Sequence, residues 1–294
     1  MRCLLLLALL LNLTPTSLSA NNFNHSLLTA THTHNNGAYT RKAFLALNKQ
    51  PFESQNSKRK LLIIGDSHAQ DFLNGILENH YLSQYQIRTH YIPTRCQIAF
   101  KRSAKPYLAP QDQVFCEHAN ELEWAKQQVA DAQVIIVVAR WRDWSAQLLP
   151  KTLKQLTIKP NQQVMVLGTR DFGKVTLKQY MHLPIHELKT LSNKVDPVPI
   201  ATNEPLRKGA EHYIFIDQQS LICGSLKTCR LFTNKGELIS YDGGHLTPAG
   251  AKWIGQRLFQ DSALSQLLTQ KSFILTQQPD LTLLFSSIHF KHHF

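Results

Sequence analysis

The sequence predicts a three-layer α/β/α domain built on a mostly parallel sheet. Short apolar runs alternate with amphipathic stretches from residue 60 onward, and two of the runs, LLII at 61–64 and VIIVV at 134–138, contain no polar residue. Strands that are buried on both faces have this composition. Because right-handed crossovers place helices on both faces of a parallel sheet, the alternation predicts three layers.

Each expected element follows from its local pattern. The expected strands are apolar or alternating runs at residues 60–66, 85–93, 133–140, 163–169 and 212–218. The expected helices carry apolar residues at helical spacing and span residues 69–82, 116–132, 143–156 and 247–259. A proline-rich insertion is expected at about 170–211, after the fourth strand, where long insertions usually shape the substrate side.

The chain of 294 residues is expected to form one main domain, from 58 to 268, with shorter segments on either side. Residues 21–57 are rich in Asn, Thr, His, Ser and Gln and predict a mostly irregular lead segment with room for a short helix over 41–47. Residues 269–294 are expected to form a C-terminal appendage, whose apolar run, LTLLF, suits either an added edge strand or an amphipathic segment.

The first twenty residues have the pattern of a cleavable signal peptide. A short basic start precedes an apolar run of about ten residues and a small-residue exit that ends at Ala20. The alternative is an uncleaved membrane anchor, for which the apolar run is too short. We therefore expect an exported protein, secreted or periplasmic.

Export changes the interpretation of the cysteines, because disulfides persist in oxidising compartments. Cys96, Cys116, Cys223 and Cys229 form an even set that allows three pairings. We favour Cys96 with Cys116 and Cys223 with Cys229, since each pair brackets a loop that a local bridge would close. A zinc site is the alternative, but the sequence has no CxxC pair or tight Cys/His cluster to support it. We expect no metal and no cofactor.

The formal net charge of +12 favours an anionic partner. Nucleic acid is disfavoured because the chain is expected to be exported and its basic residues are dispersed without interleaved aromatic residues. An anionic envelope glycan or membrane surface fits better. The alternative is that Lys and Arg only keep the surface solvated.

Ser67 follows the first apolar run in the sequence LLIIGDSHA, at the carboxyl end of the first expected strand. Ligands of open parallel sheets bind beyond this edge, and a helix N-terminus there favours negative charge. Ser67 is therefore a candidate nucleophile. On its own it would more readily be interpreted as the cap of the following helix.

A serine nucleophile needs a base, and the base needs an orienting group. Asp242 lies three positions before His245 in the sequence YDGGHLTPAGA, so its carboxylate can reach the imidazole Nδ1 and leave Nε2 free for a hydroxyl. Gly243 and Gly244 allow the tight backbone that this hydrogen bond requires. The alternative for Asp242 and His245 alone is a solvated turn.

Together, GDSHA at 65–69 and DGGHLTPAGA at 242–251 resemble the first and last motif blocks of SGNH hydrolases, a family with a flavodoxin-like fold. The resemblance is greatest to the extracytoplasmic SGNH domain fused to bacterial membrane-bound O-acyltransferases. It covers residues 58–262, and its weaker middle part includes Cys96, Cys116, VVARW at 137–141 and FIDQQSLIC at 215–223.

The resemblance implies acyl transfer with Ser67 as nucleophile, His245 as base and Asp242 as its orienting group. It also implies an oxyanion hole that contains the Ser67 N–H. The Gly and Asn donors of typical SGNH hydrolases have no clear counterpart here, so Arg140 and Cys96 are the remaining oxyanion or substrate candidates. A packing role with Trp141 is an equal alternative for Arg140.

We therefore expect an exported O-acetyl esterase or O-acyltransferase that acts on esters of an envelope polysaccharide or glycolipid. A transferase would receive its acyl group from a separate membrane protein. The alternative is a non-catalytic SGNH-fold module that binds acylated glycan. A nucleotide-binding domain is disfavoured because the chain has neither a GxGxxG nor a GK[ST] loop. The sequence does not determine the oligomeric state.

Overall fold

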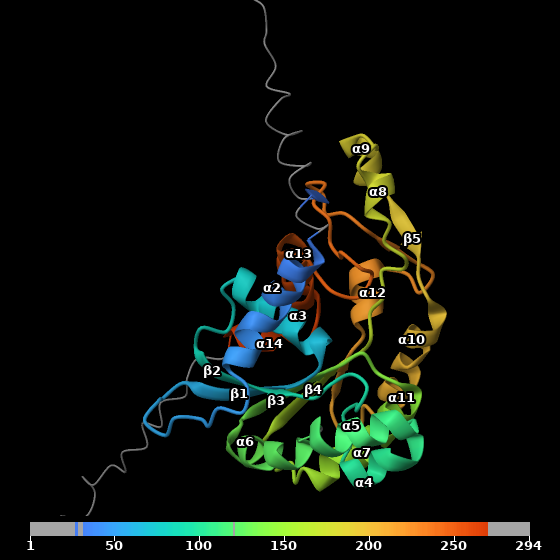
Figure 1. Cartoon of the computed structure of the whole chain (residues 1–294). Helices are drawn as coiled ribbons and strands as arrows, with labels where there is room; N and C mark the ends of the chain where they lie inside the picture. Colours follow the sequence, from blue (N-terminus) through green and yellow to red (C-terminus); the bar gives the residue numbers. More distant parts are fainter. Residues whose placement is uncertain (1–26, 29–31, 120, 270–294) are drawn as a thin grey trace, which may run out of the picture.

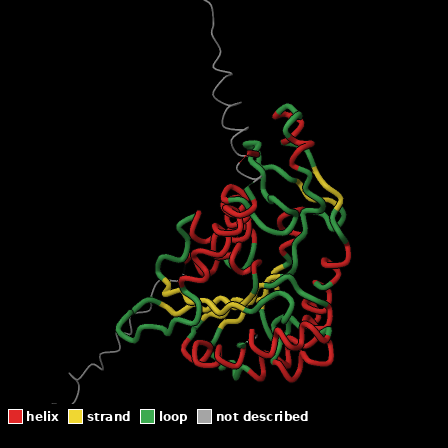
Figure 2. The backbone as a smooth tube through the Cα atoms, in the orientation of Figure 1, coloured by secondary structure: helices red, strands yellow, loops and turns green. Residues whose placement is uncertain are grey.

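A five-stranded parallel sheet forms the centre of the structure, a computed structural model that describes residues 27–28, 32–119 and 121–269. The strands have the order β2-β1-β3-β4-β6, and helices cover both faces of the sheet (Figures 1 and 2). The sheet consists of β1 (Arg59–Gly65), β2 (Tyr85–Tyr91), β3 (Val134–Val138), β4 (Gln163–Leu167) and β6 (Ile214–Ile216). The predicted three-layer α/β/α class is confirmed.

The two helical layers account for the unbroken apolar strands. One layer consists of α2 (Thr33–Ala46), α3 (Ser67–Glu78), α13 (Pro248–Asp261) and α14 (Ser265–Thr269). The other consists of α4 (Lys101–Ala104), α5 (Pro110–Ala119), α6 (Ala125–Asp131) and α7 (Asp143–Gln155), with short 3₁₀ turns at Lys105–Tyr107 and Leu122–Trp124. In β1, Leu61 and Ile63 belong to the core under the first layer, and Leu62 and Ile64 to the core under the second. Alternate side chains of one strand thus fill two cores.

The segment after β4 contains α8 (Leu177–Tyr180), α9 (Ile185–Leu188), β5 (Ser192–Lys194), α10 (Pro197–Ala201) and α11 (Asn203–Lys208). Strand β5 pairs antiparallel with β7 (Thr228–Arg230), which follows α12 (Gln218–Cys223). Helix α11 packs against α7, whereas α8 and α9 project away from the sheet (Figure 1). The segment expected as an insertion at 170–211 therefore contains short helices and one strand, β5, of a small second sheet that β7 completes.

Both favoured disulfides are confirmed. Cys96–Cys116 joins the segment after β2 to α5, and Cys223–Cys229 joins the end of α12 to β7. Because all four sulfur atoms are in disulfides, the zinc alternative for these cysteines is wrong.

Two local predictions are corrected. The expectation of a mostly irregular lead segment over 21–57 is wrong for Thr33–Ala46, which form α2. The single helix expected over 116–132 is divided into α5 and α6. Between them, the Glu121 carbonyl accepts the Trp124 N–H of a 3₁₀ turn at 2.9 Å and His90 Nε2 at 3.0 Å. The expected signal peptide at 1–20 and all but the first residue of the appendage at 269–294 lie outside the described residues. Within the described ranges, no helix is long and apolar enough to cross a membrane.

Candidate active site

The turn after β1 places Ser67 at the carboxyl edge of the sheet. A Cβ atom on Gly65 would lie 1.8 Å from the carbonyl oxygen of Val138, so only glycine allows β1 to approach β3 this closely. Asp66 is the N-cap of α3 and accepts the His68 N–H at 2.9 Å. The cap role therefore belongs to Asp66, and the alternative that Ser67 is the helix cap is wrong.

Asp66 also joins this turn to the next strand of the sheet. Its second carboxylate oxygen accepts the backbone N–H of Arg140, just beyond β3, at 3.0 Å. In the sheet, β2 lies on one side of β1 and β3 lies on the other. The direction in which successive strands are added therefore reverses between β1 and β3. Open parallel sheets bind ligands at such a switch point.

His245 connects Ser67 to Asp242 through an unbroken hydrogen-bond chain. Its Nε2 lies 2.8 Å from Ser67 Oγ, and its Nδ1 lies 2.7 Å from Asp242 Oδ2. Asp242 Oδ1 accepts the N–H groups of Gly244 at 2.9 Å and His245 at 2.7 Å. Gly243 has φ +93°, a left-handed conformation that favours glycine, and it allows the loop to turn back on itself. The structure thus brings together the three side chains predicted from the sequence.

The environment of these groups suits the roles of base and orienting group. Burial opposes ionisation of Asp242, but its hydrogen bonds and the charge of His245 outweigh burial and lower the pKa of the carboxyl. Burial likewise opposes protonation of His245, but the hydrogen bond that Nδ1–H donates to Asp242 and the charges of Asp71 and Asp242 raise the pKa of the imidazole above its ordinary value. An imidazolium at this position is therefore stabilised by carboxylates on two sides.

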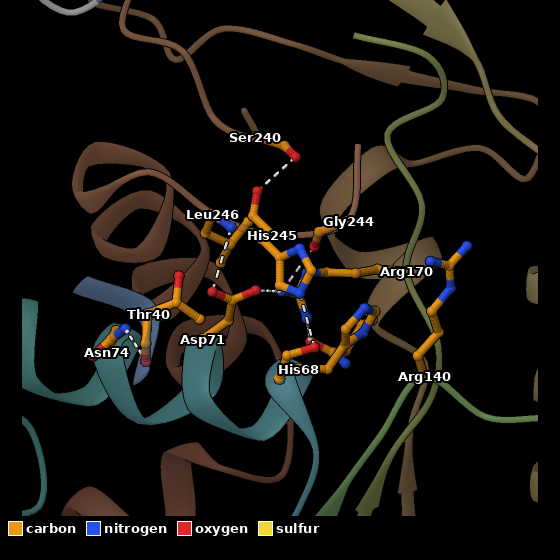
Figure 3. Close-up of polar contacts among 12 residues, drawn as sticks. Thr40, His68, Asp71, Asn74, Arg140, Arg170, Ser240, Gly244, His245 and Leu246 are labelled. Carbon is orange, nitrogen blue, oxygen red and sulfur yellow. Dashed lines mark hydrogen bonds and ion pairs between the residues drawn. The ribbon is translucent and has the colours of Figure 1, made fainter. Parts of the chain in front are cut away.

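Three further polar groups surround His245, and the sequence interpretation missed them (Figure 3). Asp71 and Arg170 form a buried ion pair at 2.8 Å, with side chains 0% and 1% exposed. His68 is buried beside Ser67, and burial and the Arg170 charge lower its pKa well below the ordinary value. Asp71 lies four residues after Ser67 on α3, and Arg170 follows β4 at the carboxyl edge of the sheet, where Ser67 also lies. These two positions are the sequence signals that could have marked both residues as parts of the site.

Of the groups expected to contact an oxyanion or the substrate, the structure leaves the Ser67 N–H and the Arg140 side chain available but not Cys96. The Ser67 N–H, at the first position of α3, has no protein acceptor among the described residues. The Arg140 backbone is held on both sides, because its N–H binds Asp66 and its carbonyl accepts Gln97 Nε2 at 3.0 Å. Its side chain is exposed at the edge of the site (Figure 3). Trp141 next to it is anchored in the core, with Nε1 donating to the Leu167 carbonyl at 2.9 Å.

Cys96 is unavailable as an oxyanion or substrate group. Its sulfur is bonded to Cys116, its side chain is fully buried, and its N–H donates to the Pro93 carbonyl at 2.8 Å. The next residue, Gln97, has φ 60°, and its Oε1 accepts the Arg142 N–H at 2.8 Å. This segment therefore serves to fix the loop after β3.

The site is open to solvent. The side chains of His245 and Asp242 are 30% and 41% exposed, and α8 and α9 extend away from the sheet in Figure 1. A bulky substrate can therefore approach Ser67 from solvent.

In the described part of the chain, no three His, Cys, Asp or Glu side chains gather as a potential metal site.

Comparisons with known proteins agree with this fold. A family model described as an SGNH domain fused to AT3 domains matches residues 32–260. The periplasmic domain of a lipopolysaccharide acetyltransferase from Salmonella ser. Paratyphi A is similar over 83% of this chain and 96% of its own, with a TM-score of 0.50 and 16% identity. No curated protein sequence matches. Because the family model spans most of the 294 residues, the chain belongs to the family of SGNH domains of the kind fused to AT3 domains.

Proposed function

We propose that the protein is an extracytoplasmic acyl-transfer enzyme, an O-acetyl esterase or O-acyltransferase that acts on esters of an envelope polysaccharide or glycolipid. The observation that carries this proposal is the chain of contacts from Ser67 Oγ through His245 to Asp242, at 2.8 and 2.7 Å. Membership of the SGNH family supports the same chemistry.

In the first half-reaction, Ser67 Oγ attacks the ester carbonyl while His245 Nε2 takes the hydroxyl proton. Asp242 holds Nδ1–H and stabilises the imidazolium that forms. Collapse of the tetrahedral intermediate breaks the bond to the alcohol, which leaves with the proton from Nε2. The acyl group then remains on Ser67.

In the second half-reaction, water or a sugar hydroxyl gives its proton to His245 and attacks the acyl-enzyme. Collapse returns the proton to Ser67 and releases either a free acid or a new ester. The Ser67 N–H, which has no acceptor in the described part of the chain, suits the developing oxyanion, and the Arg140 guanidinium is the second proposed contact. Loss of one oxyanion donor typically slows such reactions by about 100-fold or more.

The proposed compartment and substrate rest on separate features. Two disulfides support an oxidising, extracytoplasmic location. The open site suits an ester carried on a polymer, and the net charge of +12 suits an anionic envelope component. The similar periplasmic domain belongs to a lipopolysaccharide acetyltransferase, which supports a glycolipid or polysaccharide acceptor. We propose a separate membrane protein as the acyl donor of a transferase.

Hydrolysis of p-nitrophenyl acetate tests the enzyme hypothesis. We expect slow turnover that Ser67→Ala and His245→Ala abolish, together with an acyl adduct on Ser67 in the intact mass spectrum. An adduct that decays only when a candidate glycan is added would identify a transferase. Glycan binding that persists in both variants, with no turnover by the unmodified protein, would instead support the non-catalytic module.

A further inference from the structure

We propose that Asp71 and Arg170 are positioning residues that hold the backbone on both sides of His245 and place a second carboxylate beside its imidazole. This inference rests on the proposed acyl transfer through Ser67. It extends the site by one buried ion pair that links α3, the end of β4 and the loop of residues 242–246.

The two residues grip the loop from opposite sides of His245. Asp71 Oδ1 accepts the N–H of Leu246, immediately after His245, at 3.3 Å. Arg170 Nη2 lies 2.8 Å from Asp71 Oδ2 and 3.5 Å from the carbonyl oxygen of Gly244, immediately before His245. The same guanidinium therefore contacts both the helix that carries the nucleophile and the loop that carries the base (Figure 3).

Helix geometry explains why a residue at position 71 can do this. Residues four apart lie on the same face of a helix, and their side chains lean toward its N-terminus. The Asp71 carboxylate is thereby directed toward the end of α3 where Ser67 lies. The nucleophile and the anchor of the base are thus fixed to one rigid helix.

Burial sets this ion pair apart from one on the surface. Both side chains are almost completely buried, and Arg170 Nε has no partner among the described residues. Such a pair is a poor source of stability, because desolvation offsets most of the attraction between its charges. Because the pair adds little to the stability of the fold, positioning of His245 is the better explanation for its burial here.

The charges around His245 determine how the pair would influence its proton. Burial raises the pKa of Asp71 to about 7, so the charge that this carboxylate places beside His245 changes around neutral pH. The titratable or charged groups that face His245 are Asp242 and Tyr241 from its own loop, Asp66, His68 and Asp71 from α3 and its cap, and Arg170 after β4. Asp71 favours the imidazolium, whereas Arg170 disfavours it.

The test compares Asp71→Asn with the double variant Asp71→Asn/Arg170→Met. Asparagine keeps an oxygen for the Leu246 N–H but leaves the Arg170 cation without its carboxylate. We expect kcat for p-nitrophenyl acetate to fall about 100-fold, with KM nearly unchanged, because Arg170 without its carboxylate no longer holds the Gly244 side of the loop and small displacements of His245 are costly. The acid limb of the pH profile should move to lower pH. Adding Arg170→Met should move this limb back up, while kcat stays low.

A purely structural role predicts a different result. A structural role would lower the yield of folded protein but leave the acid limb of the pH profile of every variant at its position in the unmodified protein. An unchanged acid limb would therefore overturn the proposal. The double variant has no unbalanced buried charge, so it provides the comparison if Asp71→Asn alone fails to fold. Arg88→Met is the control for loss of an arginine ion pair away from the site, because Arg88 lies on the edge strand β2, pairs with Glu53 at 3.1 Å, and should leave both kcat and the acid limb unchanged when replaced.

Direct titration of His245 by NMR separates this proposal from the proposed function. In a Ser67→Ala background, Asp71→Asn should lower the pKa of the imidazole whether or not the protein turns over esters. An unchanged titration would overturn the present inference alone. Ester turnover that is insensitive to Ser67→Ala would overturn the proposed function alone.

Discussion

The Ser67 hydroxyl and His245 Nε2 lie 2.8 Å apart, although 178 positions separate the two residues in the sequence. Packing of α13 against α3 brings them together, because α13 follows directly on the loop that carries His245. The contact between Ser67 and His245, the proposed nucleophile and base, is therefore a product of the layer that covers one face of the sheet.

Replacement of Asp242 by asparagine should impair the base without removing it. The amide cannot stabilise the imidazolium and favours the wrong tautomer of His245, so we expect kcat to fall by about 10³–10⁴-fold. The measurement is steady-state hydrolysis of p-nitrophenyl acetate, with the far-ultraviolet circular dichroism of the variant as the folding control. Activity close to that of the unmodified protein would mean that Asp242 is not the orienting group.

The pH dependence should reflect the raised pKa of His245. Only the neutral imidazole accepts the Ser67 proton, so kcat/KM should rise with pH and reach half its plateau above about 6.5, the ordinary histidine value. Asp242 stays ionised throughout, because its own pKa is lowered. A profile that falls as the pH rises through neutrality would contradict His245 as the base.

The two glycines before His245 should differ in their tolerance of alanine. Gly243 has positive φ, and a Cβ atom there would lie 2.2 Å from the Gly173 carbonyl oxygen, so Gly243→Ala must displace the loop. We expect a loss of about 100-fold in kcat, as for other small displacements of catalytic groups. Gly244→Ala is the matched comparison, because its Cβ contacts at 3.7 and 3.9 Å are ordinary, and it should lose far less activity. Equal losses would argue against this explanation.

Removal of the Cys96–Cys116 disulfide should lower the free energy of unfolding by about 3 kcal/mol, as expected for closure of a loop of this length. The comparison uses Cys96→Ser/Cys116→Ser and Cys223→Ser/Cys229→Ser in urea unfolding. The second bridge spans only 6 positions, so its loss should cost less, about 2 kcal/mol. A larger effect from the shorter bridge would contradict the chain-entropy explanation.

Much of the fold was predictable because burial on both faces leaves an unmistakable composition. LLII and VIIVV became β1 and β3, the strands on either side of the switch point. The grouping of Ser67, Asp242 and His245 was predictable because Asp242 and His245 share one short segment, and Ser67 follows the first strand. Local sequence was sufficient in each case.

The missed features depend on contacts between distant segments. Helix α2 is rich in polar residues, and besides the buried Phe44 it is held by tertiary hydrogen bonds. These include Thr89 Oγ1 to the Phe44 carbonyl at 2.6 Å and Asn74 Nδ2 to the Thr40 carbonyl at 3.2 Å. The Asp71–Arg170 pair joins residues 99 positions apart. No local pattern identifies the partner of a single charged residue, so this part of the site required the structure.

The main chain of Arg140 is fixed by hydrogen bonds to both its N–H and its carbonyl, whereas its side chain is exposed. Position 140 is therefore a place where the side chain can be varied to test substrate preference. Asp66 and Gln97 fix its main chain, and Trp141 anchors the following residue, so folding places little demand on the exposed side chain. A library of residues at this position would vary the charge and size presented at the edge of the site on an otherwise constant scaffold. Selection on neutral and anionic esters would then measure how far one side chain sets the choice of substrate.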